Sequence, residues 1–247
     1  IRIVNKALTP GEMNLIAGDV ADTILSFEPT DGGAGGASIF DQDGNDVGMF
    51  TGGAGIQTAD VAVLSSGADN FGSADFTVGG TAIIDGAPFG FVNESMGGHG
   101  GDSTLEFLIN SPAGTGHSAV ITAAPGLEFH IFWGASFTGI EGSDRWMCGD
   151  YDRPKVAFGD HNAGVPLDVG WHQVAIVRSE IAPEQYQWDW WYDGVQQAAQ
   201  TLVTNGRLPL GDGVGTWGLN NRGGFAWNGL IDEIRMVAKA LTPEEMN

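Results

Sequence analysis

The chain has 247 residues, of which 31 are acidic and 10 basic, and its formal net charge is -21. Such a surface repels nucleic acid and anionic lipid, so both are excluded as partners, and no apolar run approaches the roughly 18 residues that membrane insertion requires. Forty glycines disfavour a helical protein, and the single cysteine excludes an internal disulfide framework. The acidity has two open interpretations, namely bound cations or solubility in saline surroundings.

The chain opens with IRIVNKALTPGEMN (residues 1–14) and closes with IRMVAKALTPEEMN (residues 234–247), which are identical at eleven of fourteen positions. Each copy predicts a strand, a link and one helical turn, in which Thr242 caps, Pro243 takes the first helical position and Glu245 completes a capping box.

Three origins of the repeat are open: the tail of a preceding domain in a tandem array, a strand that completes a neighbouring subunit, or a duplication inside one sandwich. We favour the array. The array divides the chain into two parts. Residues 1–14 are a terminal strand and helical turn that resemble the end of a preceding repeat. Residues 15–247 are a single domain.

Between the two copies, short apolar runs alternate with glycine and aspartate turns, which is typical of an antiparallel all-β protein. In the run 172–178, Val174 and Ile176 are expected on one face of a strand and Ala175 and Val177 on the other. The pair Asp193–Gly194 predicts a tight hairpin. The expected strands are residues 21–27, 61–65, 81–85, 104–109, 118–122, 127–134, 172–178, 186–194 and 230–237.

The acidic stretch DQDGND (residues 41–46) is the first candidate site. Side-chain oxygens can converge on a hard cation such as calcium from four residues of this stretch, namely Asp41, Asp43, Asn45 and Asp46. Calcium takes about six to eight oxygen ligands, so this loop cannot bind it alone. The alternative is an acidic turn held by its own hydrogen bonds.

A second cluster mixes acidic and aromatic residues within positions 141–162. Aromatic faces can stack on a sugar ring while carboxylates and amides bind its hydroxyl groups. The candidate carbohydrate-binding residues are Trp146, Asp150, Tyr151, Asp152 and Asn162. The alternative is an ordinary long loop with solvated charges and an aromatic anchor.

Candidates for catalysis are poor. Asp232 and Glu233 are adjacent in an expected strand and therefore point to opposite faces, so they cannot both address one glycosidic bond. No Gly-x-Ser-x-Gly elbow occurs, and Cys148 has no histidine near it in sequence. We expect no catalytic residues.

The stretches GWHQVAIVRS (170–179), WDWWYDGVQ (188–196) and WGLNNRGGFAWNGLIDEIRMVAKALTPEEM (217–246) resemble the laminin-G-like, concanavalin A-like jelly-roll domains, and residues 26–48 resemble them more loosely. The resemblance implies an all-β fold of two antiparallel sheets in a jelly-roll sandwich, with short helical turns after the first and last strands. It places Trp171, Trp190 and Ile234 in or near the core. It also implies that the acidic loop lies near the final strand, which adds Glu28 and Asp232 to the expected ligands of a structural calcium ion.

From these features we expect a non-catalytic, extracellular or cell-surface module that serves adhesion or carbohydrate binding in a surface or filamentous assembly. Its expected partners are neighbouring copies, reached through residues 1–14, and glycans. The alternative is a carbohydrate-binding or catalytic module of a polysaccharide-degrading enzyme, and the missing carboxylate pair counts against catalysis.

Overall fold

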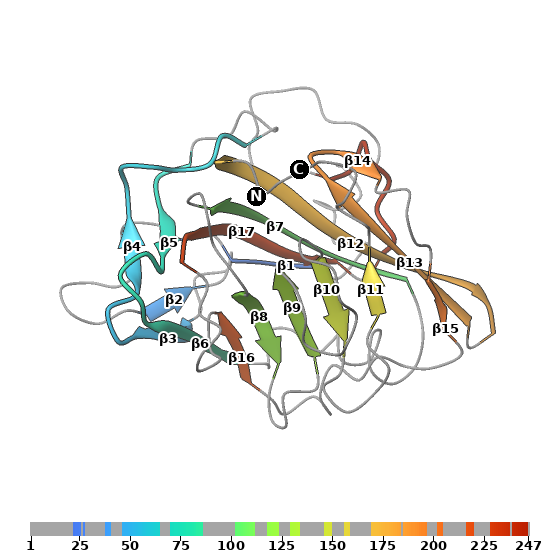
Figure 1. The fold of residues 1–247 in the computed structure, drawn as a ribbon, viewed down its shortest axis with the longest axis horizontal. Helices are drawn as coiled ribbons and strands as arrows, with labels where there is room; N and C mark the ends of the chain where they lie inside the picture. Colours follow the sequence, from blue (N-terminus) through green and yellow to red (C-terminus); the bar gives the residue numbers. More distant parts are fainter. Residues whose placement is uncertain are drawn as a thin grey trace.

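Every regular element in the described part of the computed structural model is a β-strand (Figure 1). The repeated segment 1–14 lies outside the described residues. The structure describes residues 22–25, 27, 38–40, 46–64, 70–85, 102–111, 118–123, 129–133, 146–149, 156–158, 169–183, 185–196, 202–204, 216–219, 228–237 and 239–246.

The first sheet, sheet A, has the strand order β14-β13-β12-β7-β17-β5-β4, with β1 also pairing with β17 and β15 with β13. All its described pairs are antiparallel. Its strands are β1 (Asp22–Leu25), β4 (Gly55–Gln57), β5 (Ser73–Asp75), β7 (Ser103–Ser111), β12 (Gly170–Ala182), β13 (Gln185–Tyr192), β14 (Val195–Gln196), β15 (Leu202–Thr204) and β17 (Leu230–Val237).

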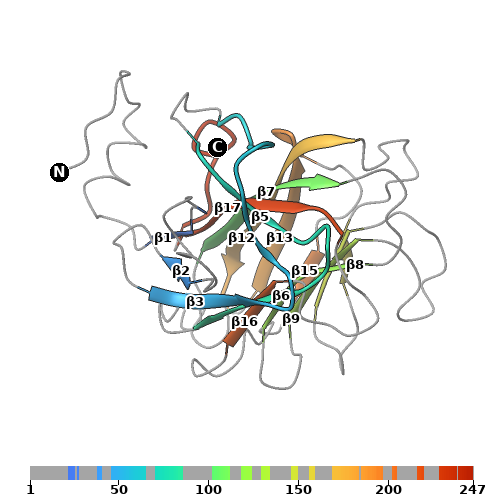
Figure 2. The ribbon, with the colours of Figure 1, turned by 90° about the vertical axis from the view of Figure 1, so that its left-hand side faces the viewer.

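The second sheet, sheet B, has the order β11-β10-β9-β8-β16-β6-β3-β2 and is also antiparallel. Figure 2 shows the two sheets as two layers. The strands of sheet B are β2 (Ser38–Phe40), β3 (Asp46–Thr51), β6 (Thr81–Asp85), β8 (Ser118–Ala123), β9 (Phe129–Trp133), β10 (Trp146–Gly149), β11 (Val156–Phe158) and β16 (Thr216–Leu219). The prediction of an all-β, two-sheet jelly-roll sandwich is confirmed.

Three phenylalanines join the layers. Phe50 on β3 of sheet B lies 5.9 Å from Phe27 and 6.2 Å from Phe76, measured between ring centroids. Phe27 follows β1 and Phe76 follows β5, so both belong to the sheet A side. All three are buried. Tilted aromatic pairs of this kind add about 0.5–1.5 kcal/mol each beyond their burial.

Strand β12 is buried on both faces, because its alternating side chains meet different partners. Residues Val174 to Arg178 are all buried. Ala175 and Val177 join Val237 in an apolar cluster with residues of the C-terminal tail, which we define as residues 239–246. Val174 and Ile176 point the other way, as the alternation predicts. We call the face under the tail the outer face of sheet A.

The C-terminal tail packs Leu241 and Met246 into this cluster, against Trp191 and Ala240. It contains one turn, in which the amides of Glu245 and Met246 donate to the carbonyl oxygen of Thr242 at 2.9 and 3.2 Å. The Thr242 amide donates to Glu245 Oε2 at 3.1 Å, which is the glutamate half of the predicted capping box. Although burial acts to raise the pKa of Glu245, hydrogen bonds from Lys239 and Thr242 hold it below its usual value.

The hairpin between β13 and β14 has the predicted two-residue turn. Asp193 and Gly194 both have positive φ, 48° and 72°, as this turn requires. Asp193 Oδ2 also lies 2.8 Å from Nδ1 of His172, whose ring stacks on Tyr192 at 5.0 Å. His172 therefore stabilises this hairpin through its contacts with Tyr192 and Asp193.

The strands predicted at 81–85 and 230–237 have the observed bounds. The strand predicted at 61–65 is wrong, because residues 61–64 form no strand and Val63 is 93% exposed. They belong instead to the connection between β4 and β5, residues 58–72, which we call the β4–β5 loop. Trp190 and Ile234 are buried and Trp171 is half-buried, as the resemblance implies.

Candidate functional site

Asp232 lies where β17 changes its neighbour. Along one edge of β17, Leu230 and Ile231 pair with β5, whereas Ile234 to Val237 pair with β1. Between Asp232 and Arg235 the register with β7 shifts by one residue, and Glu233 has a φ of 46°. Such a bulge turns backbone N–H groups away from the regular ladder, so they need other acceptors.

The Asp232 carboxylate is the acceptor for these groups. Its Oδ1 accepts the Glu233 amide at 2.9 Å, and its Oδ2 accepts Asn70 Nδ2 at 2.7 Å. The backbone of Phe27, just beyond β1, also bonds to it. Asn70 Nδ2 lies 3.0 Å from the carbonyl oxygen of Ala62 as well. The carboxylate thus holds together the end of β1, the β17 bulge and the β4–β5 loop.

Asp232 is fully buried, with 0% of its surface exposed. Burial, opposed by the hydrogen bond from Asn70, raises the pKa of Asp232 to about 7 from an ordinary value of 3.8. A buried carboxylate of this kind is costly to ionise without a cation or further donors. It has the electrostatic character of a structural clamp or a cation ligand, and its burial keeps it from substrates.

The β4–β5 loop has a second anchor at Asp60. Its Oδ1 accepts Trp171 Nε1 at 2.7 Å and its Oδ2 accepts Asn110 Nδ2 at 2.9 Å. Gln57 Oε1 accepts the Asp60 amide at 2.9 Å, which closes the start of the loop. The loop thus reaches across β7 and β12. It returns through Gly72, where an added Cβ would lie 2.1 Å from the Phe27 carbonyl oxygen, so a side chain is excluded there.

The C-terminal tail is held by a buried ion pair. Arg235 Nη1 donates to Glu106 Oε1 at 2.7 Å, and both side chains are almost wholly buried. The same Nη1 lies 3.2 Å from the Glu245 carbonyl oxygen in the tail. Thr104 Oγ1 donates to the Lys239 carbonyl at 2.7 Å and accepts the Leu241 amide at 3.0 Å.

Of the five predicted calcium ligands, Asp232 alone lies in the described part of the chain. The other four, Glu28, Asp41, Asp43 and Asn45, lie outside the described residues. In sequence, residues 41–45 lie between the paired strands β2 and β3. The oxygen chemistry and burial of Asp232 suit a cation, but both its oxygens already accept N–H bonds. Among the described residues, no group of three or more His, Cys, Asp or Glu side chains could hold a metal ion. The described residues therefore fit calcium only in part.

Of the predicted carbohydrate-binding residues, Trp146 begins β10, and Asp150, Tyr151, Asp152 and Asn162 lie outside the described residues. Sheet B has a core face and an outer face, which the β6 side chains distinguish. Ala82 and Ile84 are buried, whereas Ile83 between them is 36% exposed.

The backbone register connects β6 to β10 through the strands between them. Ile84 pairs with Trp217, Trp217 with Ala123, and Ala123 with Phe129. Trp133 lies four residues further along β9 and pairs with Trp146, as Phe158 of β11 does from the other side. Trp146 is therefore a ladder position of sheet B between β9 and β11.

The family model of the concanavalin A-like lectin/glucanases superfamily matches residues 91–247, more than half of the chain. The chain belongs to this superfamily. The laminin-G-like resemblance of the sequence is thereby confirmed. No curated protein matches the sequence significantly.

Solved structures share the fold at low sequence identity. Domain 4 of AbnA, an extracellular GH43 arabinanase from Geobacillus stearothermophilus solved with arabinotriose, has a TM-score of 0.58 at 16% identity over 92% of this chain and 95% of that one. The binding domain of botulinum neurotoxin serotype D has a TM-score of 0.56 at 12% identity over 90% of this chain and 49% of that one. Trypanosoma rangeli sialidase with sialic acid has a TM-score of 0.51 at 16% identity over 90% of this chain and 31% of that one.

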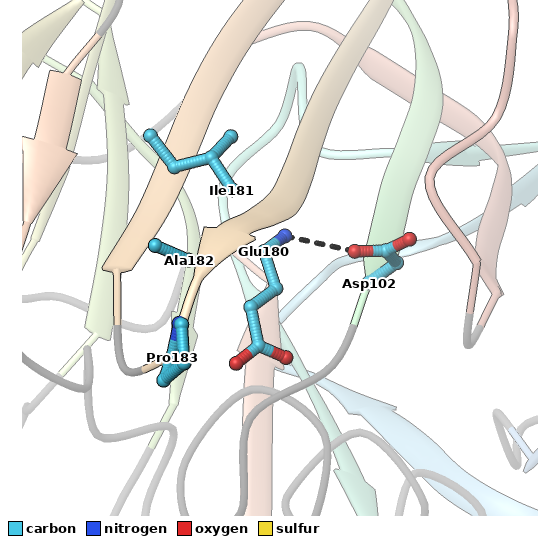
Figure 3. Close-up of a pocket in the computed structure, with 5 residues that line it drawn as sticks. All are labelled: Asp102, Glu180, Ile181, Ala182 and Pro183. Carbon is cyan, nitrogen blue, oxygen red and sulfur yellow. Dashed lines mark hydrogen bonds between the residues drawn. The ribbon is translucent and has the colours of Figure 1, made fainter.

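A shallow pocket of about 470 Å³ lies at the end of β12, lined by Asp102, Glu180, Ile181, Ala182 and Pro183 (Figure 3). Asp102 Oδ1 accepts the Glu180 amide at 2.8 Å. Figure 3 shows the Glu180 carboxylate directed away from that of Asp102. The two carboxylates therefore do not form a pair that could act on one bond.

The sequence missed Asn70, Asp60 and Glu106, which hold the two covers of the outer face. Each of these residues bonds to a partner that is more than 100 positions away in the sequence, so no local motif identifies it. Within the described residues, no helix is long and apolar enough to cross a membrane.

Proposed function

We propose that this chain is a non-catalytic, extracellular carbohydrate-binding module that works in a surface assembly of like domains. The observation that carries the proposal is membership of a lectin and glucanase superfamily, together with a fold shared over nearly the whole length of AbnA domain 4, which was solved with arabinotriose. Adhesion follows from the same activity when several modules stand side by side.

The environment of Asp232 supports a non-catalytic role. The adjacent carboxylates Asp232 and Glu233 are the nearest equivalent of a glycosidase pair in the sequence. Asp232 is fully buried and accepts hydrogen bonds on both oxygens, and Glu233 sits in a bulge. Two carboxylates must flank one glycosidic bond for hydrolysis, and this pair does not offer that arrangement.

The proposed glycan site lies at the sheet edge formed by β10 and β11. Asp150, Tyr151 and Asp152 belong to the connection between these strands, and Asn162 follows β11. Strand β11 has three residues, so about 10 Å of strand separates its two ends. The formal net charge of -21 disfavours acidic glycans, so a neutral oligosaccharide is the proposed ligand class.

The test is titration calorimetry of the full chain with a neutral oligosaccharide, using arabinotriose as the probe, and with sialic acid for comparison. Tyr151→Ala should abolish binding and leave the melting temperature unchanged, because a rim residue contributes to recognition and not to the core. Trp146→Ala should also weaken binding, because its aromatic ring is the second one in the predicted site. Undiminished binding in Tyr151→Ala and in an Asp150→Asn, Asp152→Asn variant would refute the site.

We also propose a structural calcium ion held by Glu28, Asp41, Asp43, Asn45 and Asp232. The support is that a cation beside the buried Asp232 would stabilise its ionised form. A ligand that binds only the folded state raises the melting temperature, by an amount that grows with its concentration. Melting curves with calcium and with chelator should therefore differ, and the difference should shrink in Asp41→Asn, Asp43→Asn. Identical melting curves of the unaltered chain with calcium and with chelator would refute the proposed calcium site.

A second candidate is a carbohydrate-binding or catalytic module of a polysaccharide-degrading enzyme. AbnA domain 4, which is similar over most of this chain, belongs to an extracellular arabinanase. A reducing-sugar assay on plant and bacterial polysaccharides tests the catalytic form of this candidate. Release of reducing ends by the chain alone would replace the non-catalytic proposal with this one.

A further inference from the structure

The outer face of sheet A receives the C-terminal tail through a defined set of contacts. Glu106 binds Arg235, and Thr104 binds both the Lys239 carbonyl and the Leu241 amide. Leu241 and Met246 fill the apolar cluster over β12. These contacts occupy the acceptor surface of this domain.

The N-terminal segment carries the same anchoring chemistry. Its three differences from the tail, at positions 3, 5 and 11, correspond to Met236, Ala238 and Glu244. Of these three, the structure describes the side chain of Glu244, which is exposed. The anchoring residues are all repeated, at Ile1, Arg2, Val4, Lys6, Ala7, Leu8, Thr9, Glu12 and Met13.

We propose that residues 1–14 dock on the outer face of another domain of this kind, which precedes this one in the same polypeptide. The acceptor would present a glutamate for Arg2, a hydroxyl for the backbone near Leu8, and small apolar side chains under Leu8 and Met13, as Glu106, Thr104 and the β12 cluster do here. The proposal rests on the assembly part of the proposed function and names its partner.

The position of the repeat within β17 favours a preceding domain over exchange between separate chains. The C-terminal copy begins at Ile234, inside β17 (Leu230–Val237). Its first residues complete a strand whose earlier half, Leu230 and Ile231, pairs with β5 and β7. In an acceptor built like this domain, residues 1–4 would continue a strand whose earlier half belongs to the acceptor, which favours an acceptor in the same polypeptide.

The full chain offers matched variants for the first test. Leu241→Ala should lower the melting temperature by about 5–10 °C, because it empties a core position. Leu8→Ala should leave it unchanged, because the acceptor of Leu8 is another domain. An equal loss in Leu8→Ala would overturn the proposal and place residues 1–14 within their own sandwich.

The second test supplies the acceptor. A tandem chain joins residues 15–233 directly to residues 1–247, so that Ile1 follows Glu233 of the upstream unit. Both units should resist proteolysis, and Leu8→Ala should now lower the melting temperature of the upstream unit by as much as Leu241→Ala lowers that of the downstream one. An upstream unit that is degraded, or that is indifferent to Leu8→Ala, refutes the docking.

A third measurement separates the tandem from exchange in trans. Analytical ultracentrifugation of the full chain should give a monomer, with or without residues 1–14. A dimer that is lost on deletion of residues 1–14 overturns the tandem form in favour of exchange. Oligosaccharide binding of the deleted chain reports on the carbohydrate function independently, so failure of one proposal does not mimic failure of the other.

Discussion

The outer face of sheet A is covered by two segments of different chemistry. The C-terminal tail buries Leu241 and Met246 and is tied by the enclosed Glu106–Arg235 pair. The β4–β5 loop crosses the same sheet and is held by polar side chains, Asp60 at one end and Asn70 at the other. Asp60 is exposed, and Val63 within the loop is almost wholly so.

This difference predicts a difference in energetic weight. Burial of apolar side chains contributes about 1.5–3 kcal/mol each, whereas a typical hydrogen bond contributes about 1 kcal/mol net. The tail should therefore be part of the cooperative core, and the loop should open at lower cost. The contact between Asn70 of the loop and Asp232 is an exception to this low cost, because the Asp232 carboxylate is fully buried.

Removal of the charge of Glu106 should have the largest effect. Glu106→Gln keeps the shape but leaves the buried Arg235 cation without its carboxylate, which should lower the free energy of unfolding by about 3–5 kcal/mol. Urea denaturation measures it. The double variant Glu106→Met, Arg235→Met should regain most of the loss, since no unpaired charge remains. A loss below about 1 kcal/mol in Glu106→Gln would show that this ion pair contributes little to stability.

The second effect concerns pH. Because the pKa of Asp232 rises from 3.8 to about 7 on folding, the folded protein keeps a proton that the unfolded chain has already released between these values. Its contribution to the free energy of unfolding is therefore present below about pH 4 and is lost as the pH rises to about 7, at most on the order of 4 kcal/mol.

Urea denaturation in chelator at pH 5, 6 and 7 measures this loss. Asp232→Asn does not titrate, so its stability should fall less over the same range. If Asp232 is a calcium ligand as proposed, added calcium should reduce the decline in the unaltered chain, because the cation favours the ionised carboxylate. Parallel pH profiles for the two proteins would show that Asp232 is already ionised when folded.

Features encoded by neighbouring residues could be predicted from the sequence. Alternating apolar residues located β6 and β17, Asp193–Gly194 located a hairpin turn, and the Thr242 to Glu245 spacing located the turn of the tail. In each, the residues that determine the conformation lie within one element, so periodicity and turn chemistry are sufficient.

Features that join distant residues could not be predicted. Asp232 and Asn70 are 162 positions apart, and Arg235 and Glu106 are 129 apart. Asp232 was predicted as a site residue from the resemblance, but its partners were not. The apolar run at 61–65 was wrongly predicted as a strand, because apolar residues in a loop can resemble a strand in sequence, and the Ala62 carbonyl accepts a side-chain bond from Asn70 instead of a ladder bond.

A third prediction measures the apolar part of the tail. Leu241→Ala should lower the free energy of unfolding by about 3 kcal/mol, because it removes a buried side chain from the cluster over Ala175 and Val177. Glu244→Ala, an exposed position in the same tail, is the matched control and should change it by less than about 0.5 kcal/mol. Equal stability of the two variants would mean that the tail is not part of the cooperative core.

The smallest effect is expected in the loop. Asp60→Asn keeps one acceptor oxygen and turns an amide toward either Trp171 Nε1 or Asn110 Nδ2, so one of these two bonds is lost at a cost of about 1 kcal/mol. Hydrogen exchange should show faster opening of residues 57–62 with little change at β12 and β17, because the loop is a cover and not a part of the ladder. Thr58→Ala, exposed in the same loop, should change neither. If Asp60→Asn destabilised the whole sheet as much as Leu241→Ala, the loop would belong to the same cooperative unit as the tail, and polar anchoring would then be as strong on this face as apolar burial.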